Sequence, residues 1–436
     1  MNRRFTITLR LPTLLLVGGL VAAAWRGPTA PPPQFVVPPE MTATERPKLP
    51  IDMFAWRRIP QDAPSAHASS LAMAPDGSLL MAWFAGEREG ARDVAIQMAR
   101  LPRSVFGAPW RADGFHAPSE DSNASPAEYW VSLTREQLQA LTSRVIRKIG
   151  NPVLWFDGKG RLHMHVVSVS YGGWSGSAIN QLVSDDEGRT WSSAKRLILS
   201  PFFNLSTLVR TQPQILQDGS VGLPAYHEFV QKWGLWVRLD ADGALLQSVP
   251  MQRYEGNWLQ PAVVATSPTE AVAALRAGSH APRVVGRSAT SDGGRTWPLN
   301  PSDSTIDIPN PDSSMAMIRL SDGSLLMACN PLEQGRNRLQ LFHSEDGGSK
   351  WKPSRLIEAS DGGDEFSYPA LVQDRDGRIH LSYTWKRQAI CLCTFSPEWL
   401  DQPAPDDAPA VRRESAQTAD AASSSKAAAS SQGATP

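Results

Sequence analysis

The chain contains 436 residues, in which 43 lysines and arginines balance 43 aspartates and glutamates. Because these formal charges cancel, there is no global basic surface that would attract nucleic acid or an acidic membrane, and any charged site must be local. The length suits two or three average domains, but large all-β repeat folds also reach it as single units, so length alone does not divide the chain.

Residues 1–25 predict a targeting signal. Basic residues precede an apolar run over 11–25 that is too short for a comfortable membrane span. Ala22 and Ala24 offer a small-residue cleavage pattern, and an uncleaved N-terminal anchor is the alternative. Both interpretations predict export, with the body of the protein periplasmic or extracellular and any membrane contact made only through that anchor.

Two further segments have the composition of tails. Residues 26–50 are rich in proline and predict a stiff, extended linker. Residues 401–436 are rich in Ala, Ser, Gln and Thr with few large apolar side chains, which predicts a disordered tail.

Between the tails, over residues 51–400, one hairpin pattern repeats. Each copy is an apolar run, a turn that usually carries Asp-Gly, and a second run of β-branched, Leu or aromatic residues. The turns begin at Asp76, Asp157, Asp218, Ser267, Asp322 and Asp376. After the first interval they recur about every 50–60 residues, which leaves room for a four-stranded antiparallel sheet with its loops. The pattern predicts an all-β fold, a six-bladed β-propeller.

The last copy has too few strands to complete its sheet. Only one further strand, Ile390 to Phe395, follows the sixth hairpin. Residues 52–59 alternate as a strand should, so we expect them to pair with the last blade and close the ring.

The longer first interval predicts one inserted helix in blade one. Thr134 and Gln137 match a capping box. Apolar residues then recur at helical spacing until Gly150 and Pro152 end the run: Leu138, Leu141, Val145 and Ile149.

A second motif follows three of the hairpins. The sequence Ser-x-Asp-x-Gly-x-Thr-Trp at 184–191 has close variants at 290–297 and 344–351, and this is the pattern called an Asp-box. The Asp can accept backbone N–H groups of a tight turn, the Gly supplies positive φ, and the Trp can fill the seam between neighbouring sheets. We therefore expect structural rather than catalytic roles for Asp186, Asp292 and Asp346.

With these repeats the chain resembles the sialidase (neuraminidase) superfamily, in its bacterial branch of BNR-repeat, sialidase-like proteins. The resemblance implies a site at the mouth of the central channel, on the face opposite the Asp-boxes. It also implies a Tyr nucleophile with a Glu base, an Asp acid/base and three Arg that bind the substrate carboxylate. A neutral phenol approaches an anomeric carbon that bears a carboxylate without like-charge repulsion, and it needs activation because its pKa lies near ~10.

The resemblance assigns roles to three residues and leaves two positions altered. Tyr368, in Phe-Ser-Tyr-Pro, resembles the nucleophile, Asp93 lies in the loop of the acid/base, and Arg276 resembles a carboxylate-binding arginine. The Glu is expected where Gln260 stands, and an amide cannot take a proton. The first arginine is expected where the chain has His67.

Other residues at strand ends near the expected mouth could replace what is missing. His67 could act as a base or donor, or be a structural histidine. Glu228 could act as the base, or form a salt bridge with Arg210. Just before Tyr368, where another arginine is expected, the chain has Glu365. The residues predicted to bind substrate are Arg276, Gln260, Arg88, Arg210, Arg387 and Glu365.

These observations predict an exported, sialidase-like glycoside hydrolase that acts on the terminal acidic sugars of a glycan. One alternative is a propeller that binds a glycan or a protein without turnover, and another is a uronic-acid lyase with His67 or Tyr368 as base. No phosphate-binding, dinucleotide or zinc motif occurs, so we expect no cofactor and no metal. We expect one pocket to unite the following residues, with Asp93 roughly 5–10 Å from Tyr368: His67, Asp93, Glu228, Gln260, Arg276 and Tyr368.

Overall fold

The computed structural model describes residues 31–402 except 107–126, 193, 200–203, 205, 252–256 and 299–303. The expected targeting signal at 1–25 and nearly all of the expected tail at 401–436 lie outside the described residues. Among the described residues, no helix is long and apolar enough to cross a membrane.

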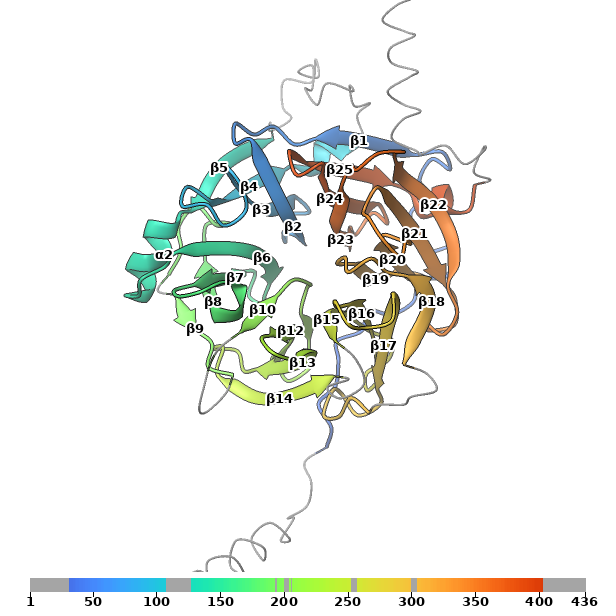
Figure 1. The fold of residues 1–436 in the computed structure, drawn as a ribbon. Coiled ribbons are helices and arrows are strands. Elements are labelled where there is room, and N and C mark those ends of the chain that lie inside the picture. Colours follow the sequence, from blue (N-terminus) through green and yellow to red (C-terminus); the bar gives the residue numbers. More distant parts are fainter. Residues whose placement is uncertain are drawn as a thin grey trace, which may run out of the picture.

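Six antiparallel sheets surround a central channel, which confirms the predicted six-bladed β-propeller (Figure 1). Blade one contains β2 (Ser65–Met73), β3 (Leu79–Gly86), β4 (Ala95–Leu101) and β5 (Glu128–Leu133). Blade two contains β6 (Lys148–Phe156), β7 (Leu162–Val169), β8 (Ser177–Ser184) and β9 (Lys195–Arg196). Blade three contains β10 (Thr207–Val209), β11 (Gln214–Ile215), β12 (Val221–Glu228), β13 (Lys232–Leu239) and β14 (Leu245–Met251).

The remaining blades follow the same plan. Blade four contains β15 (Trp258–Ala265), β16 (Ala271–Ala277), β17 (Val284–Thr290) and β18 (Thr305–Pro309). Blade five contains β19 (Ala316–Arg319), β20 (Leu325–Cys329), β21 (Arg338–Ser344) and β22 (Lys352–Ala359). Blade six contains β23 (Phe366–Gln373), β24 (Ile379–Trp385), β25 (Ala389–Phe395) and, from the start of the chain, β1 (Phe54–Arg58). The helical segments are η1 (Arg103–Phe106), α2 (Arg135–Thr142), η2 (Trp174–Gly176) and α3 (Pro397–Leu400).

The ring closes where the sequence predicts. β1 runs antiparallel to β25, with Trp56 opposite Cys393. The first and last parts of the described chain thus share one sheet, so β25 has no open edge on this side.

Apolar packing lies between the blades rather than within one central core. The described residues form six buried clusters, and each lies at one interface between two neighbouring blades. The first strand of each blade packs against the first strands of its neighbours, so these strands line the channel. Residues at the ends of the first strands can therefore meet across the channel although they are far apart in sequence.

The motif turns use their Asp side chains as expected. Asp186 accepts the backbone N–H of Thr190 at 2.8 Å, and the equivalent carboxylates in the other two motifs do the same. The tryptophans differ from the expectation, however. Trp297 is buried, whereas Trp191 and Trp351 are only half-buried.

The inserted helix is present but shorter than its apolar spacing predicts. α2 begins with the expected capping box of Thr134 and Gln137. It ends at Thr142 because Ser143 adopts a left-handed conformation and caps it. Ile149 lies in β6 rather than in the helix, so the prediction was wrong beyond the first two turns.

The proline-rich segment is extended but is not a free linker. Residues 31–50, which we call the strap, cross the face of the propeller that carries the Asp-Gly turns, which we call the strap face. Phe35 is fully buried, and its backbone N–H donates to the carbonyl of Pro268 at 2.7 Å. The N–H of Met41 donates to the carbonyl of Ser321 at 2.7 Å. The strap therefore bonds to both blade four and blade five on the strap face.

Candidate functional site

The face opposite the strap, the site face, has an unusual backbone feature that recurs in every blade. At or just before the site-face end of each first strand, one residue other than glycine adopts a left-handed conformation, with φ between 46° and 61°. In four blades the register of the first two strands shifts at this position, as in a β-bulge. The six residues are Ala68, Asn151, Ser206, Gln260, Asp312 and Tyr368.

This conformation costs roughly 1–3 kcal/mol for a residue with a side chain, and bulges beside active sites redirect side chains. Gln260, Asp312 and Tyr368 are all joined through Arg276, which extends from β16. The strained positions thus present polar side chains from three blades to one point. We call these four residues and their bonded neighbours the Tyr368 site.

Tyr368 is the centre of this network. Arg276 Nη1 donates to its hydroxyl oxygen at 2.9 Å. Burial raises the pKa of Tyr368, but the charges of Arg276 and Arg336 and a hydrogen bond with Gln260 outweigh it, so the net pKa is lowered. The site therefore stabilises the phenolate, the nucleophilic form of the side chain.

Gln260 lies where the resemblance places the catalytic Glu. Its side chain is buried, its Oε1 accepts from Arg276 at 3.0 Å, and its Nε2 donates to the Tyr226 hydroxyl at 3.1 Å. Burial raises the pKa of Tyr226, so this second phenol stays neutral. Gln260 supports Tyr368 with hydrogen bonds but cannot remove its proton.

A second arginine, Arg336, was missed by the sequence reasoning. It lies between β20 and β21, and its guanidinium is 5.7 Å from the centre of the Tyr368 ring. It donates to Glu365 at 3.0 Å and to the carbonyl of Asp312 at 2.7 Å. The connection between the second and third strands reaches the site face in every blade. An arginine in this connection, such as Arg336 between β20 and β21, could therefore have been proposed from the strand order.

Glu365 holds two arginines in place. Arg336 and Arg387 each donate to it at 3.0 Å, and Arg387 also donates to Glu89 at 2.6 Å. Burial raises the pKa of Glu365, but the two arginines and Ser367 outweigh this effect. The net pKa is lowered, so Glu365 is ionised. Glu365 thus positions Arg387, which was predicted to bind substrate, together with Arg336, which was not.

His67 lies beside Tyr368, with 4.1 Å between the ring centres. It is buried, and its Nδ1 is 2.9 Å from the hydroxyl of Thr384. Burial and four nearby arginines hold its pKa well below the usual value, so His67 is neutral at physiological pH. After burial, the charges of these arginines are the next largest causes of the shift, so positive charge lies close to His67.

Arg210 was expected to contact substrate, but the structure places it beneath the site. It is buried, and it donates to the carbonyl oxygens of Ser69, Tyr368 and Pro369 at 3.0, 2.6 and 2.9 Å. Burial lowers its pKa to about 10, so it remains charged. Arg210 links blade three to blades one and six across the channel and holds the backbone of Tyr368.

Three predicted residues lie outside the bonded network, two of them in the loop after β3 and one at the end of β12. Asp93 is exposed, and its carboxylate accepts the backbone N–H of Glu87 at 2.7 Å. Arg88 is exposed in the same loop. Glu228 pairs with Lys232 at 3.2 Å and not with Arg210, the partner considered as the alternative to a catalytic role.

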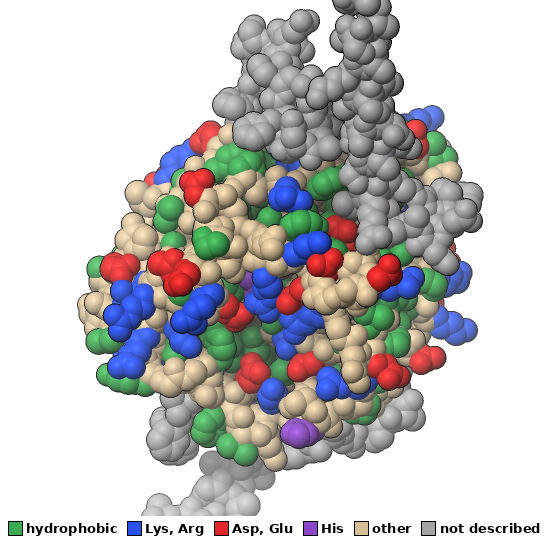
Figure 2. All heavy atoms as spheres, turned by 45° about the horizontal axis from the view of Figure 1, so that its top comes forward, with side chains coloured by type: hydrophobic (Ala, Val, Ile, Leu, Met, Phe, Trp, Pro, Cys, Tyr) green, Lys and Arg blue, Asp and Glu red, His purple; other side chains and the backbone are tan. Residues whose placement is uncertain are grey.

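Charge is dense but mixed over this region. Four arginines and three carboxylates surround Tyr368. Figure 2 shows basic and acidic side chains next to each other around a hollow in the middle of the visible face. Among the described residues, no group of three His, Cys, Asp or Glu is arranged to hold a metal ion. The arrangement suits a small anionic ligand in contact with a phenol.

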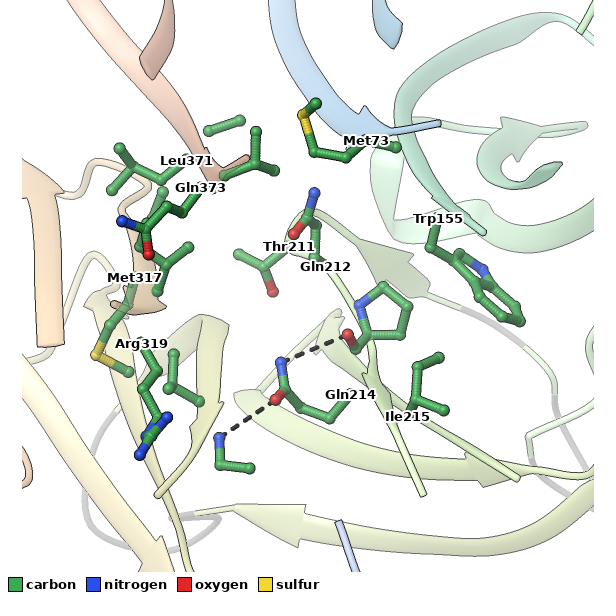
Figure 3. Close-up of a pocket in the computed structure, with 18 of the residues that line it drawn as sticks. Met73, Trp155, Thr211, Gln212, Gln214, Ile215, Met317, Arg319, Leu371 and Gln373 are labelled. Atoms are coloured by element: carbon green, nitrogen blue, oxygen red, sulfur yellow. Dashed lines mark hydrogen bonds between the residues drawn. The ribbon is translucent and has the colours of Figure 1, made fainter. Parts of the chain in front are cut away.

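A separate cavity of about 630 Å³ lies in the channel on the strap side. Figure 3 shows Met73, Trp155, Gln212 and Met317 around it, and the strap residues Val36 to Met41 contribute to its wall. Arg210 lines this cavity and also bonds the carbonyl of Tyr368, so it separates the cavity from the Tyr368 site.

Comparisons with known proteins agree with this architecture. A family model described as "BNR repeat-like domain" matches residues 77–381. A search of curated proteins found no significant match.

Several solved structures share the fold. The Hadza microbial sialidase Hz136 is 16% identical, with a TM-score of 0.61 over 78% of this chain and 67% of that chain. The NanB sialidase from Streptococcus pneumoniae is 10% identical, with a TM-score of 0.59 over 78% of this chain and 69% of that chain. The intramolecular trans-sialidase from Ruminococcus gnavus is 12% identical, with a TM-score of 0.57 over 78% and 96%. At these identities the likeness is one of fold.

Proposed function

Because this chain belongs to the BNR repeat-like family and has a sialidase-like propeller fold, we propose that it is an exported glycoside hydrolase that acts on terminal acidic sugars. The observation that carries the proposal is the hydrogen bond from Arg276 to Tyr368, in a site whose positive potential lowers the pKa of that phenol. The two sialidases named above share the fold, which supports a glycan as the ligand.

In the proposed reaction, the substrate carboxylate binds to the guanidinium groups of Arg276, Arg336 and Arg387. Tyr368 first loses its phenol proton to solvent. Its oxygen then attacks the anomeric carbon while Asp93 donates a proton to the departing glycosidic oxygen. Water then attacks the same carbon, with Asp93 taking the water proton, and the bond to Tyr368 breaks. The lowered pKa of Tyr368 replaces the base that Gln260 cannot provide.

One observation also favours a second candidate, a uronic-acid lyase. Gln260 occupies the place of the expected carboxylate base, and the neutral His67 lies against Tyr368. A phenolate or imidazole could remove the proton next to an arginine-bound carboxylate. The electron pair would then form a carbon–carbon double bond and expel the glycosidic oxygen, which takes a proton from solvent.

The test uses the full chain with a fluorogenic sialoside and a panel of uronic-acid oligosaccharides. Fluorophore release supports hydrolysis, and ultraviolet absorbance of an unsaturated sugar supports elimination. Tyr368→Phe should abolish hydrolysis, and also elimination if Tyr368 rather than His67 is the base. Tyr129→Phe, on the outermost strand of blade one, is the matched control that should keep activity. Ligand binding without any product would overturn both catalytic proposals in favour of a binding propeller.

A further inference from the structure

The arginines of the Tyr368 site are paired with carboxylates of this chain. Arg276 Nε donates to Asp312 at 2.7 Å, and Arg336 Nη1 donates to Glu365 at 3.0 Å. Both carboxylates are firmly placed, since Asp312 belongs to the ring of left-handed residues and Glu365 bonds two arginines. A ligand carboxylate that enters the site therefore has to compete with carboxylates that are already bound.

Arg387 differs from the other two arginines because it has two carboxylate partners. Its Nε donates to Glu365 at 3.0 Å, and its Nη1 donates to Glu89 at 2.6 Å. Among the described residues, Arg387 is the only hydrogen-bond partner of the Glu89 side chain. That side chain is 38% exposed, compared with 22% for Glu365, and exposed ion pairs contribute little free energy. Glu89 is thus the more loosely held of the two carboxylates.

The backbone holds Arg387 in a fixed position. Lys386 and Arg387 are the central residues of a tight turn, and both adopt the left-handed conformation, with φ of 52° and 59°. The N–H of Gln388 closes this turn by donating to the carbonyl of Trp385 at 2.9 Å. The N–H of Ala66 in blade one donates to the carbonyl of Arg387 at 3.0 Å. Because the surroundings determine this strained backbone, an exchange of partners at Arg387 requires movement of Glu89 instead.

Glu89 lies in the exposed loop between β3 and β4. Two hydrogen bonds of this loop are internal to it. Asp93 accepts the N–H of Glu87 at 2.7 Å, and the N–H of Ala91 donates to the carbonyl of Arg88 at 3.0 Å. The Glu89 side chain connects the loop to blade six. Exposed segments with few contacts open at low free energy, so the Glu89 carboxylate can leave Arg387 without disturbing the blades.

The charge of Glu89 also reaches the phenol. Burial raises the pKa of Tyr368, the charges of Arg276 and Arg336 lower it, and the charge of Glu89 raises it. Charges of exposed groups are screened by salt within about 10 Å, so this effect agrees with a carboxylate close to the phenol. Glu89 therefore acts on the Tyr368 site as a bound ligand carboxylate would act.

We propose that Glu89 is an internal competitor for the substrate carboxylate, which occupies Arg387 Nη1 in the empty site and leaves it when an acidic ligand binds. This inference rests on the proposed function, in which Arg387 binds the carboxylate of the sugar. It deepens that function by naming a residue that determines specificity. A ligand must supply an anion that replaces Glu89, so neutral sugars, which cannot make this exchange, are rejected.

The experiment compares the binding of acidic sugars with that of their uncharged methyl esters. The full chain is titrated calorimetrically with N-acetylneuraminic acid, with glucuronic acid and with the methyl ester of each. Glu89→Gln keeps the size of the side chain but removes its charge, and Glu87→Gln is the matched control at an exposed position of the same loop. Glu89→Gln should bind at least one of the acids about threefold or more tightly than the wild type does, because Arg387 Nη1 is free.

The affinity of Glu89→Gln for the methyl esters should equal that of the wild type. The control Glu87→Gln should change neither affinity. Equal or weaker binding of both acids by Glu89→Gln would overturn the inference, and would show that Glu89 holds Arg387 in a productive orientation.

A second background separates competition for Arg387 from a general change of charge. When Arg387→Gln is already present, Glu89→Gln should no longer tighten the binding of the acids, because the two side chains act through one ion pair. A gain of the same size in both backgrounds would overturn the inference.

Failure of the proposed function would be recognised separately. If Glu89→Gln tightens binding but no product forms from a fluorogenic sialoside, the inference is supported although hydrolysis fails. If the wild type forms product and Glu89→Gln does not tighten binding, the inference alone is overturned. If neither the wild type nor Glu89→Gln binds either acid, the inference is overturned together with the assignment of an acidic ligand.

Discussion

Arg276 Nη1 lies 2.9 Å from the hydroxyl oxygen of Tyr368, and this hydrogen bond joins blade four to blade six across the mouth of the channel. Replacing Arg276 with Gln removes the charge that stabilises the phenolate, so the pKa of Tyr368 should rise. Ultraviolet titration of tyrosinate, with Tyr368→Phe to identify the signal, measures this pKa. The control is Arg283→Gln, at an exposed position, which should leave the pKa of Tyr368 unaltered. A titration of Tyr368 that is identical in Arg276→Gln and the wild type would show that the bond has no electrostatic effect.

Gln260→Glu should increase hydrolysis. The new carboxylate would lie within hydrogen-bond reach of Tyr368 and could take its proton, and general bases typically contribute about 10²–10⁴ in rate. We expect at least roughly a tenfold gain in kcat on a fluorogenic sialoside. Gln260→Leu, which removes the same hydrogen bonds without adding a base, is the control and should lose activity. A Glu variant no faster than the wild type would mean that proton removal from Tyr368 does not limit the reaction.

Four histidines should make the protein less stable in acid. Burial holds the pKa values of His67, His163, His165 and His380 below the usual 6.5, that of His165 at about 3. Below pH ~6.5 the unfolded chain binds protons that the folded chain does not. The stability is thus complete above this pH and falls as the pH drops toward the folded-state pKa values, by up to about 1.4 kcal/mol per pH unit for each histidine.

Denaturant unfolding at pH 7.5 and 5.5 measures this dependence. His165→Gln should flatten it, whereas a change at the exposed His280 should not. Equal free energies of unfolding at the two pH values would contradict the assignment of neutral buried histidines.

The motif tryptophans should differ in their contributions to stability. Trp297 is 4% exposed and packs 5.5 Å from the ring of Trp236, so Trp297→Ala should cost about 3–5 kcal/mol. Trp191 is only half-buried, and its replacement should cost less. Thermal or denaturant unfolding gives both values. Activity per folded molecule should be retained, and a stable Trp297→Ala variant with a specific loss of ligand affinity would indicate a role in binding instead.

The strap should contribute to the stability of the propeller. Phe35 is fully buried, with its ring centre 5.9 Å from that of Trp236. Phe35→Ala should therefore lower the free energy of unfolding by about 3–5 kcal/mol. Val36→Ala, which alters a half-exposed neighbour, should change it by no more than about 0.5 kcal/mol. Equal effects of the two substitutions would show that the strap does not pack in solution as it does here.

The sequence placed Gln260 and Tyr368 at equivalent positions because each blade has the same chain order. Gln260 and Tyr368 both precede a proline at the start of a first strand, and repetition of the hairpin was enough to place them on one face. Arg336 was not found because its position relative to Tyr368 depends on the path of a connection, whose residues show no periodic pattern. Proline-rich composition predicts the extended backbone of residues 26–50 but says nothing about what that backbone contacts, so the packing of the strap on the strap face was not predicted.

By itself, then, the sequence determined the six blades, the closure of the ring by residues 52–59, the start of the capped helix and the face on which Gln260 and Tyr368 lie, since each follows from local periodicity or from a repeat. Only the tertiary structure decided the chemical states within the site. The pKa of Tyr368 is lowered, His67 is neutral and Arg210 is a buried support, because these properties depend on charges and burial contributed by blades far apart in the chain. Electrostatic interactions act through space, and the spatial neighbours of Tyr368 come from blades one, three, four and five.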